Sequence, residues 1–223
     1  MTISGSIRLA RLTALPALVL SIAACGGTVN DLLQEAKLGS PEAIERAVVA
    51  ISDLLAAKER AGIAFDEGDR AAIDYMRKVA LEGKVQNNRA VAISSLGRLR
   101  SVDVDDVLYA ALKDEFWLSR LLAVQAMRDL GKEGFSAALV KLLDQENQPE
   151  VKREVIAALG VLADDLSIRT LYESFLNTQR DADRDEQQNA YFVLKKLTGL
   201  TYPFDEKNKW REAYRERFGI EGS

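Results

Sequence analysis

The chain has 223 residues and a formal net charge of −4, with 34 acidic side chains against 30 lysines and arginines, one cysteine and no histidine. A mildly acidic chain is a poor general binder of nucleic acid, because phosphate binding is driven by Lys and Arg. Without histidine, a Ser-His-Asp or Cys-His catalytic site, a zinc site with the usual ligands and a histidine-ligated haem are all excluded. We therefore expect no catalytic residues, no metal and no cofactor, although carboxylate-only, Ser-Lys or Tyr-based chemistry stays open.

The N-terminal segment has the organisation of a secretory signal. Two arginines, Arg8 and Arg11, precede an apolar run over residues 12–24, and Cys25 follows a pair of alanines. A basic start, an apolar stretch and small residues at a cut site are typical of such signals. The run is too short for a transmembrane helix, which needs ~20 apolar residues.

This arrangement resembles the lipobox of bacterial lipoproteins, in which the cysteine is acylated and becomes the new first residue. The resemblance implies a signal peptide over residues 1–24 and a lipid anchor, palmitate among its acyl chains, on Cys25. It also implies a place in the bacterial cell envelope. Because Gly26 rather than Asp follows the cysteine, the expected place is the outer membrane facing the periplasm, if the host is didermal.

Residues 25–40 are expected to hold the lipidated cysteine, a short tether and a first helix that begins near Asp31. Five extended residues, 26–30, reach about 17 Å. Ser40 and Pro41 then predict a helix start, with a capping oxygen followed by a proline at the first helical position. A connector over residues 60–68 separates this helix from the next, which we predict over residues 69–81.

The remaining chain repeats itself. Four segments share one apolar pattern and start 31, 32 and 35 residues apart: NRAVAISSLGRL (88–99), SRLLAVQAMRDL (119–130), VKREVIAALGVL (151–162) and EQQNAYFVLKKL (186–197). Spacings of four and three residues place the matching apolar positions on one helix face. A second helix follows in the first three units, where Leu108, Leu139 and Leu171 match at the same period. The pattern predicts helix–turn–helix units stacked on copies of themselves.

In these units a basic residue precedes A-x-x-A-L-G and an Asp closes the preceding helix, as Asp114 does before Arg120 and Asp144 before Lys152. This pattern is similar to HEAT-like repeats of the short type first described in phycobilisome lyases. The resemblance implies an all-α fold, an α-solenoid of stacked antiparallel helix pairs. About four repeats would occupy residues 41–197, followed by a C-terminal helical cap over residues 198–223.

Several residues admit two interpretations. The recurring Arg89, Arg120 and Lys152 could bind an acidic partner, or could pair with Asp114, Asp144 or a helix end; we favour pairing, because the acids share the period. The aromatic residues at 210, 214 and 218 could dock a partner, but we favour a cap over the last repeat. Phe116 and Trp117 lie at a turn and could equally be contact residues or pack beneath the neighbouring loop.

The resemblance implies a lipid-anchored scaffold that binds an unknown protein or peptide on a concave face lined by the second helices. The residues that we expect to contact this partner are the following: Tyr109, Lys113, Trp117, Lys141, Tyr172 and Glu173. Two alternatives remain, a HEAT-like enzyme of the lyase type and a purely structural envelope protein. A hydroxylase of this family needs histidine ligands and a glycosylase needs a basic groove, and the chain has neither the histidines nor the charge.

Overall fold

A computed structural model describes residues 28–177 and 182–219, and within these ranges the regular structure is entirely helical. The elements, in chain order, are these: α2 (Val29–Leu38), α3 (Pro41–Arg60), α4 (Glu67–Glu82), α5 (Gln86–Gly97), α6 (Asp105–Ala111), α7 (Trp117–Leu130), the 3₁₀ turn η1 (Glu133–Phe135), α8 (Ser136–Gln145), α9 (Pro149–Leu162), α10 (Asp165–Leu176), α11 (Arg184–Thr198) and α12 (Lys207–Phe218).

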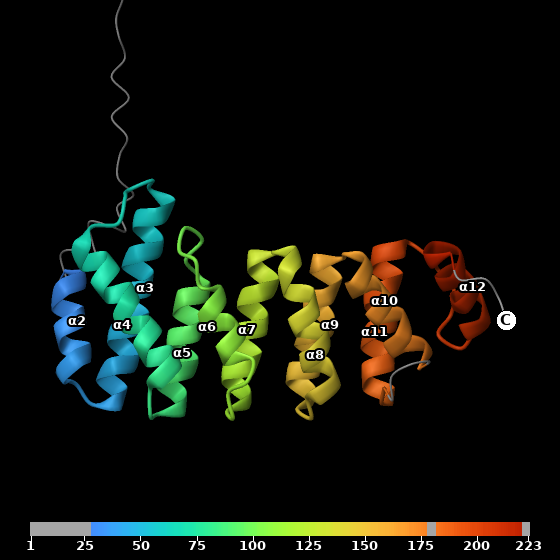
Figure 1. The fold of residues 1–223 in the computed structure, drawn as a ribbon, viewed down its shortest axis with the longest axis horizontal. Helices are drawn as coiled ribbons and strands as arrows, with labels where there is room; N and C mark the ends of the chain where they lie inside the picture. The colour runs from blue at the N-terminus through green and yellow to red at the C-terminus, as the bar shows by residue number, and fades with distance from the viewer. Residues whose placement is uncertain (1–27, 178–181, 220–223) are drawn as a thin grey trace, which may run out of the picture.

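The helices stand side by side in one elongated row (Figure 1). The first helices of successive units, α3, α5, α7, α9 and α11, pack against one another along the row, and α4, α6, α8 and α10 form the second layer. Helix α2 packs on α3 and α4 at one end, and α12 packs on α10 at the other. The predicted α-solenoid of stacked helix pairs is confirmed.

The helix boundaries follow from local capping. Ser40 caps α3 by accepting a hydrogen bond from the Ala43 backbone amide, with Pro41 in the first turn, as the sequence predicts. Asp164 and Asp183 cap α10 and α11 in the same way. Helix α7 ends at Gly131, whose φ of 65° lies in the left-handed region that closes many helices.

The repeat pattern correctly identifies the core. The first-helix positions Ala92, Ala123, Val155 and Ala190 are all fully buried, as are the second-helix positions Leu108, Leu139 and Leu171. The positions at the ends of the first helices differ among units: Leu99 is fully buried, whereas Leu130, Leu162 and Leu197 are half-buried. These buried side chains belong to one continuous apolar core.

The first helices pack closely at two glycines. A Cβ added to Gly97 of α5 would lie 2.4 Å from the Ala126 Cβ of α7, and one added to Gly160 of α9 would lie 2.4 Å from a Val193 methyl group of α11. At these two positions the first helices are too close to admit another side chain. That the second helices line a concave face stays a prediction from the repeat pattern.

Candidate interaction surface

Ion pairs join successive units along one rim of the row. The Arg89 guanidinium donates to both carboxylate oxygens of Asp114, with both nitrogen–oxygen distances at 2.7 Å. Arg120 contacts Glu146 in the same bidentate way, at 2.6 and 2.9 Å. Both side chains of each pair are largely withdrawn from solvent. The interpretation of the basic series as inter-repeat pairing is confirmed for these two arginines.

Each acid also holds the start of the next first helix. One Asp114 oxygen accepts the Phe116 backbone amide at 2.9 Å. Glu146 accepts the amides of Asn147 and Gln148, both at 2.9 Å. Burial alone would raise the pKa of Asp114 and Glu146, but the hydrogen bonds from arginine and backbone outweigh it, so both pKa values lie below their usual range.

The third pair is looser, and its acids lie at the start of α11, one of the helix ends that the pairing interpretation includes. The Lys152 ammonium lies 3.3 Å from a Glu186 oxygen and 3.4 Å from an Asp183 oxygen. The sequence points to Asp144 as the acid closing the helix before Lys152, but Glu146 is the residue buried at that helix end, and it pairs with Arg120. We call the three pairs, Arg89–Asp114, Arg120–Glu146 and Lys152–Glu186, the ion-pair ladder.

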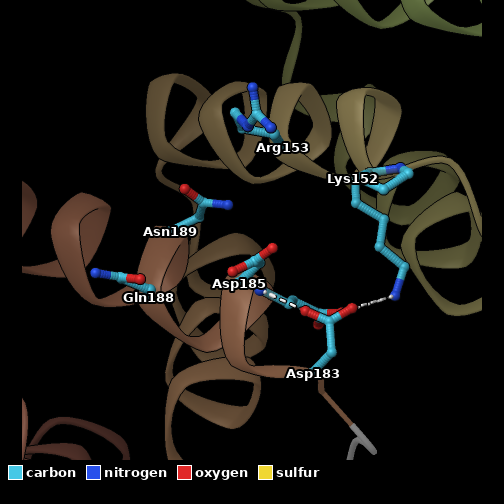
Figure 2. A pocket seen from close by; sticks show the side chains of 8 residues that line it. Lys152, Arg153, Asp183, Asp185, Gln188 and Asn189 are labelled. Atoms are coloured by element: carbon cyan, nitrogen blue, oxygen red, sulfur yellow. Dashed lines mark hydrogen bonds and ion pairs between the residues drawn. The ribbon is translucent and has the colours of Figure 1, made fainter.

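Shallow hollows open beside the ladder where successive units meet. The hollow between α9 and α11 has a volume of about 260 Å³ and is lined by polar side chains that include Lys152, Arg153 and Asp185 (Figure 2). Two others, of about 350 and 420 Å³, lie beside Arg89 and Arg120. The charged groups of the ladder pair with one another, so they do not converge on these hollows as a set of reactive groups. The hollows offer polar contacts beside the ladder.

Sequence comparison with protein families matches a model for HEAT repeats over residues 73–160 and again over residues 104–194. The two matches together cover more than half of the chain. The chain belongs to the HEAT-repeat family. Comparison with curated proteins found no match. The HEAT repeats provide a helical scaffold of the kind that presents extended surfaces to proteins.

The structure corrects one expected contact residue of the HEAT array. Tyr172 is only 1% exposed, because α12 lies across α10 and places the Trp210 and Tyr214 rings 6.2 and 5.3 Å from the Tyr172 ring. Glu173 is half-buried and accepts the Tyr214 hydroxyl at 3.2 Å. Both residues therefore hold the cap. Trp210 is itself fully buried, which confirms the cap interpretation of the C-terminal aromatic residues.

The other expected contact residues lie on different parts of the HEAT array. Tyr109 is 38% exposed, but its hydroxyl donates to the Gly134 carbonyl and its ring packs edge-on against Phe135. Lys113 is exposed just after the end of α6, and Lys141 is exposed on α8. Trp117 is half-buried against the core, which favours the packing interpretation for it. Of the expected set, Tyr109, Lys113 and Lys141 are thus exposed on the second-helix layer, and their role in binding stays a prediction.

The sequence did not predict the two most exposed apolar residues of the first helices. Val161 on α9 and Phe192 on α11 are each 58% exposed. They immediately flank Gly160 and Val193, which touch where the two helices meet. In the repeat alignment Phe192 is level with Ser94, Gln125 and Ala157. An aromatic residue at an otherwise small or polar outward position is the signal that could have identified it.

Cys25, residues 1–24 and the tether up to residue 27 lie outside the described residues. Within the described ranges, no helix is both long enough and apolar enough to cross a membrane.

Proposed function

We propose that the protein is a lipid-anchored HEAT-repeat scaffold of the bacterial cell envelope, which binds a partner protein on the outward face of its first helices. The anchor is the acylated Cys25, supported by the basic and apolar segment that precedes it. The role of the array is binding, without a catalytic step. Membership of the HEAT-repeat family supports this role, because its stacked helices form extended surfaces rather than deep pockets.

The exposure of Val161 and Phe192 is the observation that supports this surface most strongly. A valine and a phenylalanine that are 58% exposed on adjacent helices place apolar area in solvent without any gain to the fold. Large aromatic side chains are frequent anchors of protein interfaces. The same layer exposes Val49 of α3, which is 40% exposed.

The charges near this surface favour a partner of complementary sign. Lys195 and Lys196 lie on α11 next to Phe192 in the helical sequence, and both are exposed. Arg153 is exposed one helix away, on α9. A segment that presents apolar side chains flanked by Asp or Glu would match this combination.

Site-specific photocrosslinking in intact cells tests the partner surface. A photoreactive phenylalanine analogue replaces Phe192 in one strain and Tyr109, on the second-helix face, in the matched control. We expect a discrete crosslinked protein from position 192 only. A crosslink from position 109 alone would move the partner to the second helices, and no crosslink from either position would favour the purely structural alternative.

The anchor has its own test. Mass spectrometry of the N-terminal peptide should show a chain that begins at an acylated Cys25. Replacing Cys25 with Ser should release the protein from membranes. An intact leader with an unmodified thiol would contradict the anchor while leaving the scaffold role in place.

A further inference from the structure

The connection between α3 and α4 presents apolar residues at a projecting corner of the array. Ala61, Gly62, Ile63 and Ala64 are all exposed, with Ile63 at 41%. Helix α3 has 20 residues, more than any other first helix, and its end projects beyond the neighbouring helices at the upper edge of Figure 1. We call residues 61–65 the α3–α4 turn.

The α3–α4 turn has a fixed conformation. The Ile63 amide donates to the Lys58 carbonyl at 2.9 Å, and the Gly62 amide donates to the Glu59 carbonyl at 3.0 Å. Gly62 has a φ of 69°, the left-handed conformation that such a helix end requires. Phe65 packs on the core behind it. The exposed Ile63 is therefore held in place by the backbone on both sides.

The turn lies beside the point at which the described chain begins. Thr28 caps α2, and Asn30 in the first turn of α2 touches the start of α4, where a Cβ on Gly68 would lie 2.6 Å from the Asn30 amide oxygen. Figure 1 shows the start of α2 and the α3–α4 turn at the same edge of the row. Two residues lie between Cys25 and Thr28, so their Cα atoms are about 11 Å apart at most.

Two charged side chains behind the turn, Lys58 and Glu59, have hydrogen-bond partners within the protein. Lys58 contacts Asp69 at 2.5 Å and Asp66 at 3.2 Å. The Glu59 carboxylate accepts the backbone amides of Arg100 and Ser101. The approach of an apolar phase therefore leaves Lys58 and Glu59 with their partners. The exposed side chains of Arg60 and Glu67, on either side of the turn, would stay among water and lipid headgroups.

We propose that the α3–α4 turn is a second membrane contact, in which Ile63 enters the interfacial region of the bilayer that holds the anchor. This inference rests on the proposed acylation of Cys25. An anchor and a turn at the same corner give two points of contact. They orient the array with this edge toward the lipid and the ion-pair ladder at the opposite edge, away from it.

An environment-sensitive fluorophore on a single cysteine tests the contact in the full-length, processed protein. In Ile63→Cys the introduced thiol is the free one when Cys25 is acylated, because the chain has one native cysteine. Leu38→Cys is the matched control. This leucine is 88% exposed and lies at the end of α2, about 15 Å along the helix axis from the start of that helix. Ala64→Cys supplies a second position on the turn.

In vesicles of phosphatidylethanolamine and phosphatidylglycerol, we expect blue-shifted emission at positions 63 and 64, with quenching by nitroxide-labelled lipid. Position 38 should emit as it does in water. Vesicle-bound, acylated protein with water-like emission at 63 and 64, or with equal quenching at 38, would overturn the oriented contact and leave the anchor standing. Protein with a free Cys25 thiol that does not float with vesicles would overturn both.

Discussion

Arginine–carboxylate pairs contribute differently to stability according to how far they are buried. The Glu146 side chain is 2% exposed and its partner Arg120 is 18% exposed, whereas Arg98 and Asp53 form a pair in which both side chains are 48% exposed. Removing one partner of a buried pair leaves an uncompensated charge. An exposed charge is instead solvated by water, so the same chemical change has unequal effects in this chain.

Arg120→Ala should lower the free energy of unfolding by about 3 kcal/mol, the lower end of the range for breaking a buried pair, because the arginine keeps some solvent access. The comparison variant Arg98→Ala should cost about 1 kcal/mol or less. Urea denaturation followed by circular dichroism measures both. Equal losses would show that the ladder contributes no more than a surface pair.

The ladder also predicts the acid response. The lowered pKa values of Asp114 and Glu146 contribute stability that is fully present above the unfolded values, about 4, and lost as the pH falls through the folded values. With no histidine, no side chain of ordinary pKa titrates between about pH 5 and 8. The free energy of unfolding should therefore be nearly constant over that range and fall below about pH 4.

The same denaturation series includes its own control. Once Glu146 is protonated, Arg120 has no carboxylate to pair with, so the difference between the native protein and Arg120→Ala should shrink as the pH falls below about 4. A difference that stays constant down to complete acid unfolding would assign the cost of the substitution to lost packing instead.

At the scale of helices, the Leu-Gly of the repeat sets the distance between first helices. Gly97 has no side chain because the Ala126 Cβ occupies that space. Gly97→Ala should therefore push α5 and α7 apart and destabilise the protein by about 1–3 kcal/mol. Thermal or urea unfolding of the variant checks this value.

Two further variants make this prediction specific. Adding Ala126→Gly to Gly97→Ala vacates the contested space and should recover part of the loss. Gly134→Ala, where an added Cβ meets no atom within 4 Å, should change stability by less than about 1 kcal/mol. A loss at position 134 equal to that at 97 would point to backbone conformation rather than helix spacing.

The repeat period predicts which residues are buried within a unit, because burial there depends on helical spacing alone. It identifies Leu96, Met127, Leu159 and Leu194 as core, and all four are fully buried. The choice between Asp144 and Glu146 depends on where α8 ends. Helix α8 runs to Gln145, and the next residue turns inward to Arg120. A shift of two residues at a helix end is beyond what spacing can resolve.

Contacts between elements that are not adjacent units are harder to predict. Tyr172 is buried because α12 returns across α10, a path that no residue pattern within α10 reveals. The residue pattern of α9 likewise does not predict that Val161 points outward, because a valine after Leu-Gly is compatible with either face of the helix. The sequence therefore predicts the array well and its surfaces poorly.

In the molecule as a whole, each unit contacts only its neighbours, so a lesion at one end should stay local. Trp210 closes the C-terminal end: it is fully buried and lies 5.5 to 6.2 Å from the rings of Tyr172, Phe175, Tyr191 and Tyr202. Trp210→Ala should destabilise this end by about 3–5 kcal/mol. Amide hydrogen exchange should then accelerate in α10, α11 and α12, with little change in α4 and α5.

Phe192→Ala removes a side chain of similar size from an exposed position of α11, so exchange there should stay close to that of the native protein. A uniform acceleration across all helices in Trp210→Ala would instead mean that the array unfolds as one cooperative unit. The distinction bears on the proposed scaffold. If stability is transmitted only between neighbours, the capped end can loosen while the α3–α4 turn and α2 keep their structure at the corner that we assign to the membrane.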